Sequence, residues 1–165
     1  MIKGFKCFNQ GLITNYNEKL NVNKIYFAKD EIKYSKNGYH MCVNLEDTLR
    51  FFNSFSNPVD IAKVIGFGKT DRYDDEYNDF YEMYAVEFLE IIKVLSREEI
   101  IEYAKKLPDY RLIRFISLYK LTDEEIILFK KLFCNNNDIL NTILYYQENK
   151  TDVYEKEYQL VKKRF

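Results

Sequence analysis

His40 and Cys42 are the two side chains whose types and spacing most readily suggest chemistry. They lie two residues apart in the stretch Gly38-Tyr39-His40-Met41-Cys42, and His40 is the single histidine among 165 residues. On a β-strand, residues two apart share a face, so a thiolate–imidazole pair or part of a metal site is the chemistry to consider. Side chains at this spacing are separated by about 6–7 Å, which is beyond hydrogen-bond reach and disfavours the nucleophile–base pair.

A metal site would need more ligands than this pair provides. Only Cys7, Cys134 and carboxylates remain to supply them, and the three cysteines are widely spaced and odd in number. This pattern argues against a zinc site and a disulfide framework, and it predicts a reducing compartment. We therefore expect no metal, no cofactor and no catalytic residue. Gly38, His40 and Cys42 are interpreted as a structural signature in which His40 donates to a backbone carbonyl or an acidic side chain.

The acidic segment, residues 71–82, is the strongest surface feature of the sequence. Its six carboxylates are interleaved with aromatic residues and accompanied by Arg72 as the one cation. One interpretation is a solvated connector, because like charges repel. The other is a docking site, in which carboxylates imitate phosphates for a basic groove. Calcium is disfavoured because Glu76 occupies the position where an EF-hand loop requires glycine. The candidate partner-binding residues are Asp71, Tyr73, Asp74, Asp75, Glu76, Tyr77, Asp79 and Glu82.

Short strands and turns must position these residues in the first half of the chain. Alternation of apolar and polar residues predicts strands over residues 4–8, 25–28, 39–43, 59–65 and 83–92. The last of these is apolar on both faces, which predicts a central strand. Gly66-Phe67-Gly68 is expected to end the fourth strand, with a polar loop following. Asn44 is expected to cap a helix over residues 45–53, with Asp47 completing a box-like arrangement.

The second half changes to a helical period and contains an internal repeat. Leu95-Ser96-Arg97-Glu98-Glu99-Ile100-Ile101 returns 26 residues later as Leu121-Thr122-Asp123-Glu124-Glu125-Ile126-Ile127. Each copy opens with a capping box and breaks in its middle, at Pro108-Asp109 and at residues 135–138. Residues 95–120 and 121–146 are thus predicted to be two stacked helical hairpins, with a further C-terminal helix over 152–165.

Together these elements predict an α+β fold: a small, mostly antiparallel sheet with short helices, followed by a two-copy helical-hairpin repeat. We expect an α+β domain over residues 1–94 and a helical unit over 95–165, packed as one body. Hydrophobic residues make up 47% and charged residues 31%, as in ordinary globular proteins. A net charge of −1 predicts that the protein does not bind nucleic acid directly. Because the sequence has no long apolar run, we expect no membrane association and no signal peptide.

Residues 1–100 carry a series of motifs in a characteristic order. These are Lys3-Gly4-Phe5, the Gly38–Cys42 signature, Asn44-Leu45-Glu46-Asp47, a strand from Ile61 to Gly66, and Leu95-Ser96-Arg97-Glu98-Glu99. In this order and spacing the chain resembles an uncharacterised domain of phage and prophage proteins with a Gly-Phe-His-Phe-Cys signature. It departs from that pattern by lacking proline after Asn44 and by inserting the acidic segment. The resemblance implies a mobile-element origin, a mixed β/helix fold and the cytoplasm of a bacterial host.

The leading functional expectation is a non-enzymatic interaction protein of a phage or mobile element. Its candidate role is inhibition of a host nucleic-acid-handling defence enzyme, in the manner of anti-CRISPR proteins, by occlusion or charge mimicry. The expected partner is therefore a protein, a basic nucleic-acid-binding enzyme. Two alternatives stay open. The strand order, with Glu87 or Glu90 on a late strand, loosely resembles NAD-binding ADP-ribosyltransferases, and a structural or adaptor module is the other.

Overall fold

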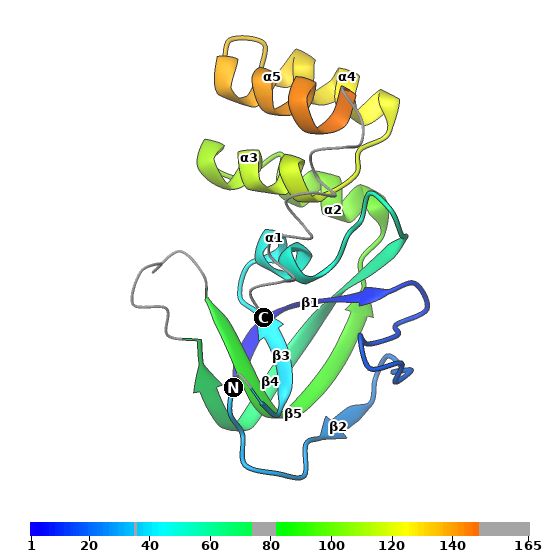
Figure 1. Cartoon of the computed structure of the whole chain (residues 1–165), viewed down its shortest axis with the longest axis vertical. Helices are drawn as coiled ribbons and strands as arrows, with labels where there is room; N and C mark the ends of the chain where they lie inside the picture. The colour runs from blue at the N-terminus through cyan, green and yellow to red at the C-terminus, as the bar shows by residue number, and fades with distance from the viewer. Residues whose placement is uncertain (35, 74–81, 149–165) are drawn as a thin grey trace. The chain divides into compact units, whose positions relative to one another are not determined.

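The chain folds into two compact units. The computed structural model describes residues 1–34, 36–73 and 82–148. Unit 1 comprises Met1–Phe52 and Ser56–Arg97 and contains the described strands (Figure 1). Unit 2 comprises Asn53–Phe55 with the described residues from Glu98 onward, and its regular structure is helical. Strands and most helices are thus segregated along the sequence, which makes the fold α+β as predicted.

Unit 1 is built on an antiparallel sheet that closes on itself. Its strand order is β2-β5-β3-β1-β4, and β4 also pairs with β5. Strands β1, β3, β5 and β4 therefore each pair with two other strands of this set and form a small barrel, which removes most of their open edges. The strands span Ile2–Asn9 (β1), Ile25–Phe27 (β2), Tyr39–Cys42 (β3), Val59–Arg72 (β4) and Met83–Val94 (β5).

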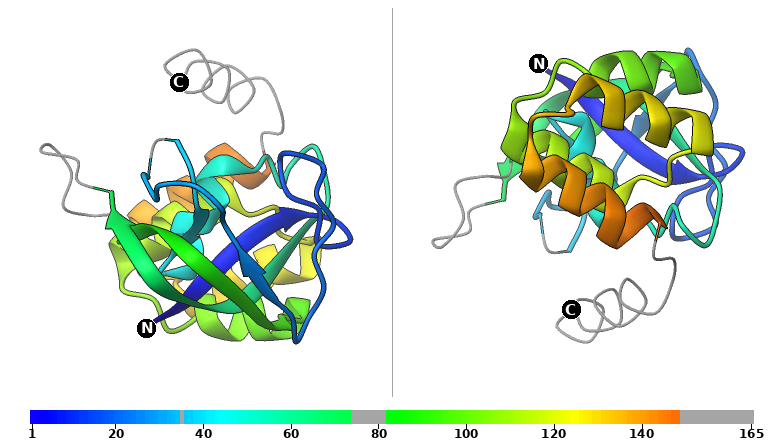
Figure 2. Two further views of the ribbon diagram at one scale, coloured as in Figure 1. Left: turned by 90° about the horizontal axis from the view of Figure 1, so that it is seen from below. Right: turned by 90° about the horizontal axis from the view of Figure 1, so that it is seen from above.

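Strand β5 has the most neighbours in this sheet. On one side it pairs with β3 and then, further along, with β2; on the other side it pairs with β4 (Figure 2). Val86, Leu89 and Ile91 belong to the barrel core, while Met83 and Ala85 are buried on the outer face. The prediction of a central strand is therefore confirmed, because an apolar pattern on both faces is typical of a strand covered on both sides.

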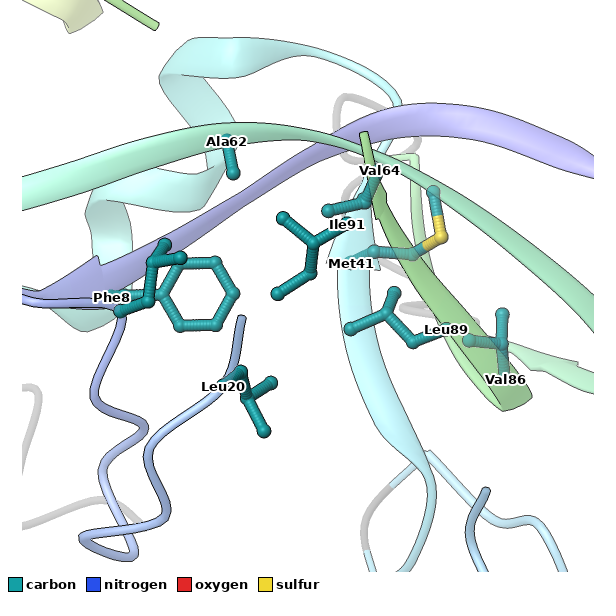
Figure 3. Close-up of a cluster of buried hydrophobic side chains, with 9 residues drawn as sticks. Phe8, Leu20, Met41, Ala62, Val64, Val86, Leu89 and Ile91 are labelled. Atoms are coloured by element: carbon teal, nitrogen blue, oxygen red, sulfur yellow. The ribbon is translucent and has the colours of Figure 1, made fainter. Parts of the chain in front are cut away.

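The barrel interior is filled by apolar side chains from every strand of the ring (Figure 3). Met41 of β3 and Val64 of β4 both belong to this core, and Ile91, which pairs with Val64, shares its face. Burial of one large apolar side chain stabilises a fold by about 1.5–3 kcal/mol. The buried members of this core are Phe8, Leu12, Leu20, Met41, Ala62, Val64, Val86, Leu89 and Ile91.

Strand β4 runs further than the sequence indicated. The predicted end at Gly66-Phe67-Gly68 is wrong, because β4 continues to Arg72 with a register shift between Phe67 and Thr70. Gly68 has a φ of +79°, and the backbone N–H of Lys69 donates to the Glu87 carboxylate at 2.8 Å. The glycine therefore marks a β-bulge rather than a terminating turn, and the glutamate satisfies a backbone donor that the bulge removes from the ladder.

Two inward-facing glycines allow the strands to approach closely around Met41. A Cβ atom on Gly4 would lie 2.2 Å from the backbone oxygen of Cys42, and one on Gly66 would lie 2.6 Å from the sulfur of Met41. Neither distance is sterically allowed. The absence of side chains at these two positions is thus a condition for β1 to pair with β3 while Met41 fills the barrel.

A short helix follows β3 and contacts β1 and β3. It comprises α1 (Leu45–Thr48) and a 3₁₀ turn (Leu49–Phe51), which is shorter than the predicted helix over 45–53. The predicted capping box is wrong: Asn44 makes no side-chain cap bond, and its Nδ2 donates instead to the Asp47 carboxylate at 3.1 Å. All four α1 residues are buried, including Glu46 and Asp47.

Unit 2 consists of short helices with well-defined starts. Thr122 forms the predicted capping box with Glu125, and Asn136 caps the next helix by accepting from the N–H of Ile139. Pro108 directly precedes α3, where the sequence predicted a break. In the part of the chain that the structure describes, no helix has the length and apolar character needed to cross a bilayer. The helices span Arg97–Ala104 (α2), Asp109–Leu118 (α3), Asp123–Leu132 (α4) and Asn137–Ile143 (α5), and a π-helical turn, Leu144–Glu148 (η2), follows.

Two buried polar side chains hold the connection between α3 and α4. The Gln147 amide accepts from the N–H of Leu121 at 3.0 Å and donates to the carbonyls of Tyr119, at 3.0 Å, and Ile116. The Ser54 hydroxyl donates to the Leu118 carbonyl at 2.6 Å. These backbone groups lie outside regular helices or at their ends, so their pairing with buried side chains removes a desolvation cost that unit 2 would otherwise carry.

We predict that Gly4→Ala destabilises unit 1 by about 2–4 kcal/mol, because the added methyl group collides with the backbone of β3. Chemical denaturation followed by circular dichroism measures the loss. Gly11→Ala is the matched control in unit 1. A Cβ atom on Gly11 would have no neighbour closer than 3.9 Å, so only its φ of +87° opposes the change, at about 1 kcal/mol. Equal losses in the two variants would contradict the proposed crowding.

We predict that Gln147→Leu lowers the stability of unit 2 by about 2–4 kcal/mol, because an apolar side chain of similar size leaves buried backbone groups without partners. Thermal unfolding with Asn141→Ala as control measures this effect. Asn141 is an exposed residue of α5, so its replacement should change stability by no more than about 0.5 kcal/mol. A Gln147→Leu variant as stable as the control would show that this amide is dispensable.

Candidate functional site

His40 and Cys42 lie on the outer face of β3, opposite to the side from which Met41 enters the barrel. Cys42 is buried, as is Cys7 on the neighbouring strand β1. Burial raises the pKa of both thiols, and the nearby Asp47 carboxylate adds to this effect at Cys42. Both cysteines are therefore held as thiols, the form that is a poor nucleophile and a poor metal ligand.

The His40 ring is held by the segment that precedes β3. Its Nε2 atom forms a short hydrogen bond with the carbonyl oxygen of Tyr34, and the two rings meet edge to face with centroids 4.9 Å apart. Because a carbonyl oxygen only accepts, Nε2 carries the proton. Burial lowers the pKa of His40, while the Tyr34 carbonyl acts in the opposite direction. The neutral imidazole thus serves as a fixed donor to the backbone.

Tyr34 in turn connects β3 with the ends of β4 and β5. Its backbone N–H donates to the Asp71 carboxylate at 2.8 Å, and its hydroxyl donates to the sulfur of Met83 at 3.4 Å. Its ring lies against that of Tyr73, with centroids 4.7 Å apart. Burial raises the pKa of the Tyr34 hydroxyl, which therefore stays protonated as a donor. We call Tyr34, His40, Asp71, Tyr73 and Met83 the Tyr34 cluster.

The Tyr34 cluster lies at the two described ends of the acidic segment. The N–H of Tyr73 donates to the Met83 carbonyl at 2.9 Å, and the N–H of Val43 donates to the Glu82 carbonyl at 2.8 Å. The histidine signature and the acidic segment, which the sequence presented as separate features, therefore meet in one place. Among the predicted partner-binding residues, Asp74, Asp75, Glu76, Tyr77 and Asp79 lie outside the described residues.

Gly38 has a backbone role at the start of β3. Its φ is +110°, a conformation that side chains disfavour, and a Cβ atom there would lie 3.1 Å from the Ala85 Cβ. The glycine allows the chain to turn from the Tyr34 segment directly into the pairing of β3 with β5. It therefore fixes the point at which His40 enters the strand.

Sequence reasoning missed Lys6, whose amine donates to the His40 carbonyl at 2.7 Å. Lys6 pairs with Ala62, so it stands on the inward-facing side of β1 and lies 5.6 Å from the centroid of the Phe8 ring. Loss of solvation lowers the pKa of its amine to about 8. The sequence does contain a signal for this residue, because Lys6 places a charged side chain at an inward-facing position between Gly4 and Phe8.

The glutamates considered for an ADP-ribosyltransferase-like site stand on β5. The Glu87 carboxylate accepts from the backbone at the β4 bulge, and Glu90 is paired between Ile65 of β4 and Ile25 of β2. Glu46 and Asp47, two acidic residues to which the sequence analysis assigned no chemical role, are buried in α1. Among residues 1–34, 36–73 and 82–148, no three His, Cys, Asp or Glu side chains are placed to share a metal ion.

No protein family, curated protein or solved structure gave a significant match to this chain. The chemistry of the Tyr34 cluster therefore rests on its own geometry. The histidine is neutral, and the thiols and the tyrosine are protonated. Groups in these states that are hydrogen-bonded or buried are suited to a structural role, which here is to hold the described ends of the acidic segment.

We predict that the His40 imidazole titrates below the ordinary value of about 6.5, because burial disfavours its charged form. The unfolded chain then binds the proton first as the pH falls, so the free energy of unfolding decreases below about pH 6.5. Since His40 is the single histidine, its Cε1 proton resonance reports this titration directly by NMR.

His40→Gln is the matched control for the stability measurement, because the amide retains a donor but does not titrate in this range. The difference in unfolding free energy between wild type and variant should shrink as the pH falls below 6.5. A measured pKa at or above 6.5, or parallel pH profiles for the two proteins, would rule out the proposed burial of a neutral imidazole.

Proposed function

We propose that this chain is a non-enzymatic interaction protein of a phage or mobile element that blocks a nucleic-acid-handling defence enzyme of the bacterial host. The acidic segment is its docking element, acting by occlusion and charge mimicry. One observation carries the proposal: both described ends of the acidic segment are fixed by the Tyr34 cluster, through Asp71, Tyr73 and Met83. A segment held at both ends loses less conformational freedom on binding than a free connector does.

The charge of this segment supports a basic partner. Six carboxylates are concentrated between Asp71 and Glu82, while the protein as a whole has a net charge of −1. A dense row of carboxylates attracts the Lys and Arg side chains that line a nucleic-acid groove, and it accelerates association at low ionic strength. The interleaved tyrosines add area that an interface buries well.

The state of the titratable groups agrees with a binding role. The neutral His40 and the buried thiols of Cys7 and Cys42 are engaged in the architecture of unit 1. The free cysteines fit the reducing cytoplasm of a bacterial host, which is where such a target would be met. Keeping these groups in their protonated, neutral forms stabilises the surface that presents the docking element.

We further propose that residues 95–120 and 121–146 are two copies of one helical hairpin. In this view α2 and α3 form the first copy and α4 and α5 form the second, and α2 and α4 begin at Arg97 and Asp123, one repeat length apart. Stacked hairpins offer an extended flank that binds other macromolecules.

Charge reversal tests the docking element. We predict that Asp74→Lys, Asp75→Lys, Glu76→Lys and Asp79→Lys together slow association with the captured target by about tenfold or more at low salt and flatten the salt dependence of the rate. The target is first isolated from a bacterial lysate with the wild-type chain, and its nucleic-acid cleavage is then measured with increasing amounts of each variant. Wild type should inhibit cleavage and the reversed variant should not.

The control variant reverses four exposed carboxylates outside the acidic segment, at Asp30, Glu31, Glu98 and Glu124. It matches the change in net charge and should retain inhibition, because a local row of charges rather than the global charge drives docking. Equal binding by wild type and the segment variant would remove the acidic segment as the docking element. Loss of binding in both variants would assign the effect to net charge alone.

A further inference from the structure

Three phenylalanines form a row across adjacent strands on the outer face of the barrel. Phe67 of β4 pairs with Phe88 of β5, and Phe88 pairs with Phe27 of β2. The centroids of the Phe67 and Phe88 rings are 5.2 Å apart with planes 9° from parallel, and those of Phe88 and Phe27 are 5.0 Å apart. These separations are close to the spacing of neighbouring strands, about 4.8 Å. Each strand therefore contributes one ring to the row, and the row ends at Phe27 of β2.

Strand β2 is the point at which this row meets solvent. In the described sheet β2 has β5 as its single strand neighbour (Figure 1). The N–H of Ala28 donates to the Glu87 carbonyl at 2.9 Å, and the N–H of Ile91 donates to the Lys24 carbonyl at 3.4 Å. Because backbone groups alternate in direction along an antiparallel strand, the N–H and C=O groups of Ile25 and Phe27 point away from β5.

The same two residues also expose their side chains. Ile25 is 60% and Phe27 is 50% exposed, which is unusual for apolar residues of a strand. Ile25 ends a second row, which runs from Ile65 through Glu90. An added strand would therefore meet backbone donors and acceptors at its edge and two apolar side chains on one face.

The charges at the ends of β2 indicate which kind of strand could pair with this edge. Lys24 and Lys29 flank the strand and are exposed, and no ion pair joins either of them to another described residue. If two copies paired antiparallel about Tyr26, Lys24 of each copy would approach Lys29 of the other, one such pair at each end of the shared edge, and these like charges would repel one another. A strand with acidic ends instead places opposite charges beside Lys24 and Lys29.

We propose that β2 is a docking edge for an extended peptide strand of a protein partner, which pairs antiparallel with Ile25–Phe27. The partner strand carries an aromatic residue opposite Phe27, a β-branched residue opposite Ile25 and acidic residues at both ends. Backbone hydrogen bonds supply affinity, and continuation of the two side-chain rows supplies specificity. This surface uses no residue of the acidic segment, so it stands independently of the proposed function.

A synthetic peptide of this pattern, Glu-Glu-Phe-Thr-Val-Glu-Glu with a terminal fluorophore, is the probe. Its binding to the full chain is measured by fluorescence anisotropy. Phe27→Ala should weaken binding about tenfold or more, and Lys24→Glu with Lys29→Glu should weaken it and reduce its salt dependence. Tyr16→Ala is the matched control, because Tyr16 is an aromatic residue of unit 1 that is 89% exposed and stands apart from β2 in sequence and pairing. This variant should bind like wild type.

Methylation of peptide nitrogens tests the strand pairing on the wild-type protein, so it does not depend on any variant folding. The N–H groups of the peptide Phe and Val face the carbonyls of Phe27 and Ile25, so methylating either nitrogen should abolish binding. The N–H of the intervening Thr points away from β2, and its methylation should be tolerated. Equal effects at all three nitrogens would overturn the proposed pairing.

Failure of the wild-type chain to bind the peptide would overturn the proposal. Two other outcomes would overturn it by assigning the edge to a different occupant. Concentration-dependent dimerisation in sedimentation that Phe27→Glu abolishes would assign the edge to a second copy of this chain. Binding of a single-stranded oligonucleotide that depends on Phe27, without binding of the peptide, would assign the aromatic row to base stacking. Circular dichroism of each variant verifies that the fold is retained.

Discussion

Pairing of β5 with three other strands is the constraint on which unit 1 depends. It hydrogen-bonds to β4 along one side and to β3 and β2 along the other, and this closes β1, β3, β5 and β4 into a barrel. A closed sheet fixes which side chains point inward, so Met41 must fill the space between β1 and β4. That space exists because Gly4 and Gly66 carry no side chain. A change at these positions would therefore be felt by every strand of the ring.

The outer face of the same barrel has two different regions, one near β3 and one near β2. Near β3, the thiols of Cys7 and Cys42 are buried, and the imidazole, phenol and carboxylate of the Tyr34 cluster each form a hydrogen bond within unit 1. In the proposed function, these groups contribute by holding the described ends of the acidic segment, which lowers the free energy spent on ordering when a partner binds. Near β2, the row that ends at Phe27 is open and lies beside unpaired backbone groups, which are the properties of a surface that accepts a strand.

Much of the fold follows from local pattern in the sequence. Alternation locates the strands, the apolar pattern of β5 identifies it as central, and the Thr122–Glu125 box locates the start of α4. These features depend on neighbours within a few residues, so the sequence alone contains them. The glycines near residue 68 predict a turn by the same reasoning, and that prediction is wrong because a bulge and a turn share the same local chemistry. Only pairing with β5 separates the two.

The site depended on contacts that no local pattern records. His40 and Tyr34 meet Asp71, Tyr73 and Met83 because β3, β4 and β5 converge, and these residues are far apart in the sequence. Lys6 is partly buried and reaches the His40 carbonyl because β1 lies beside β3. The residue types and the charge of the acidic segment were determined by the sequence, whereas the placement of its described ends was decided by closure of the sheet. Long-range hydrogen bonding selects one register among many that local preferences allow.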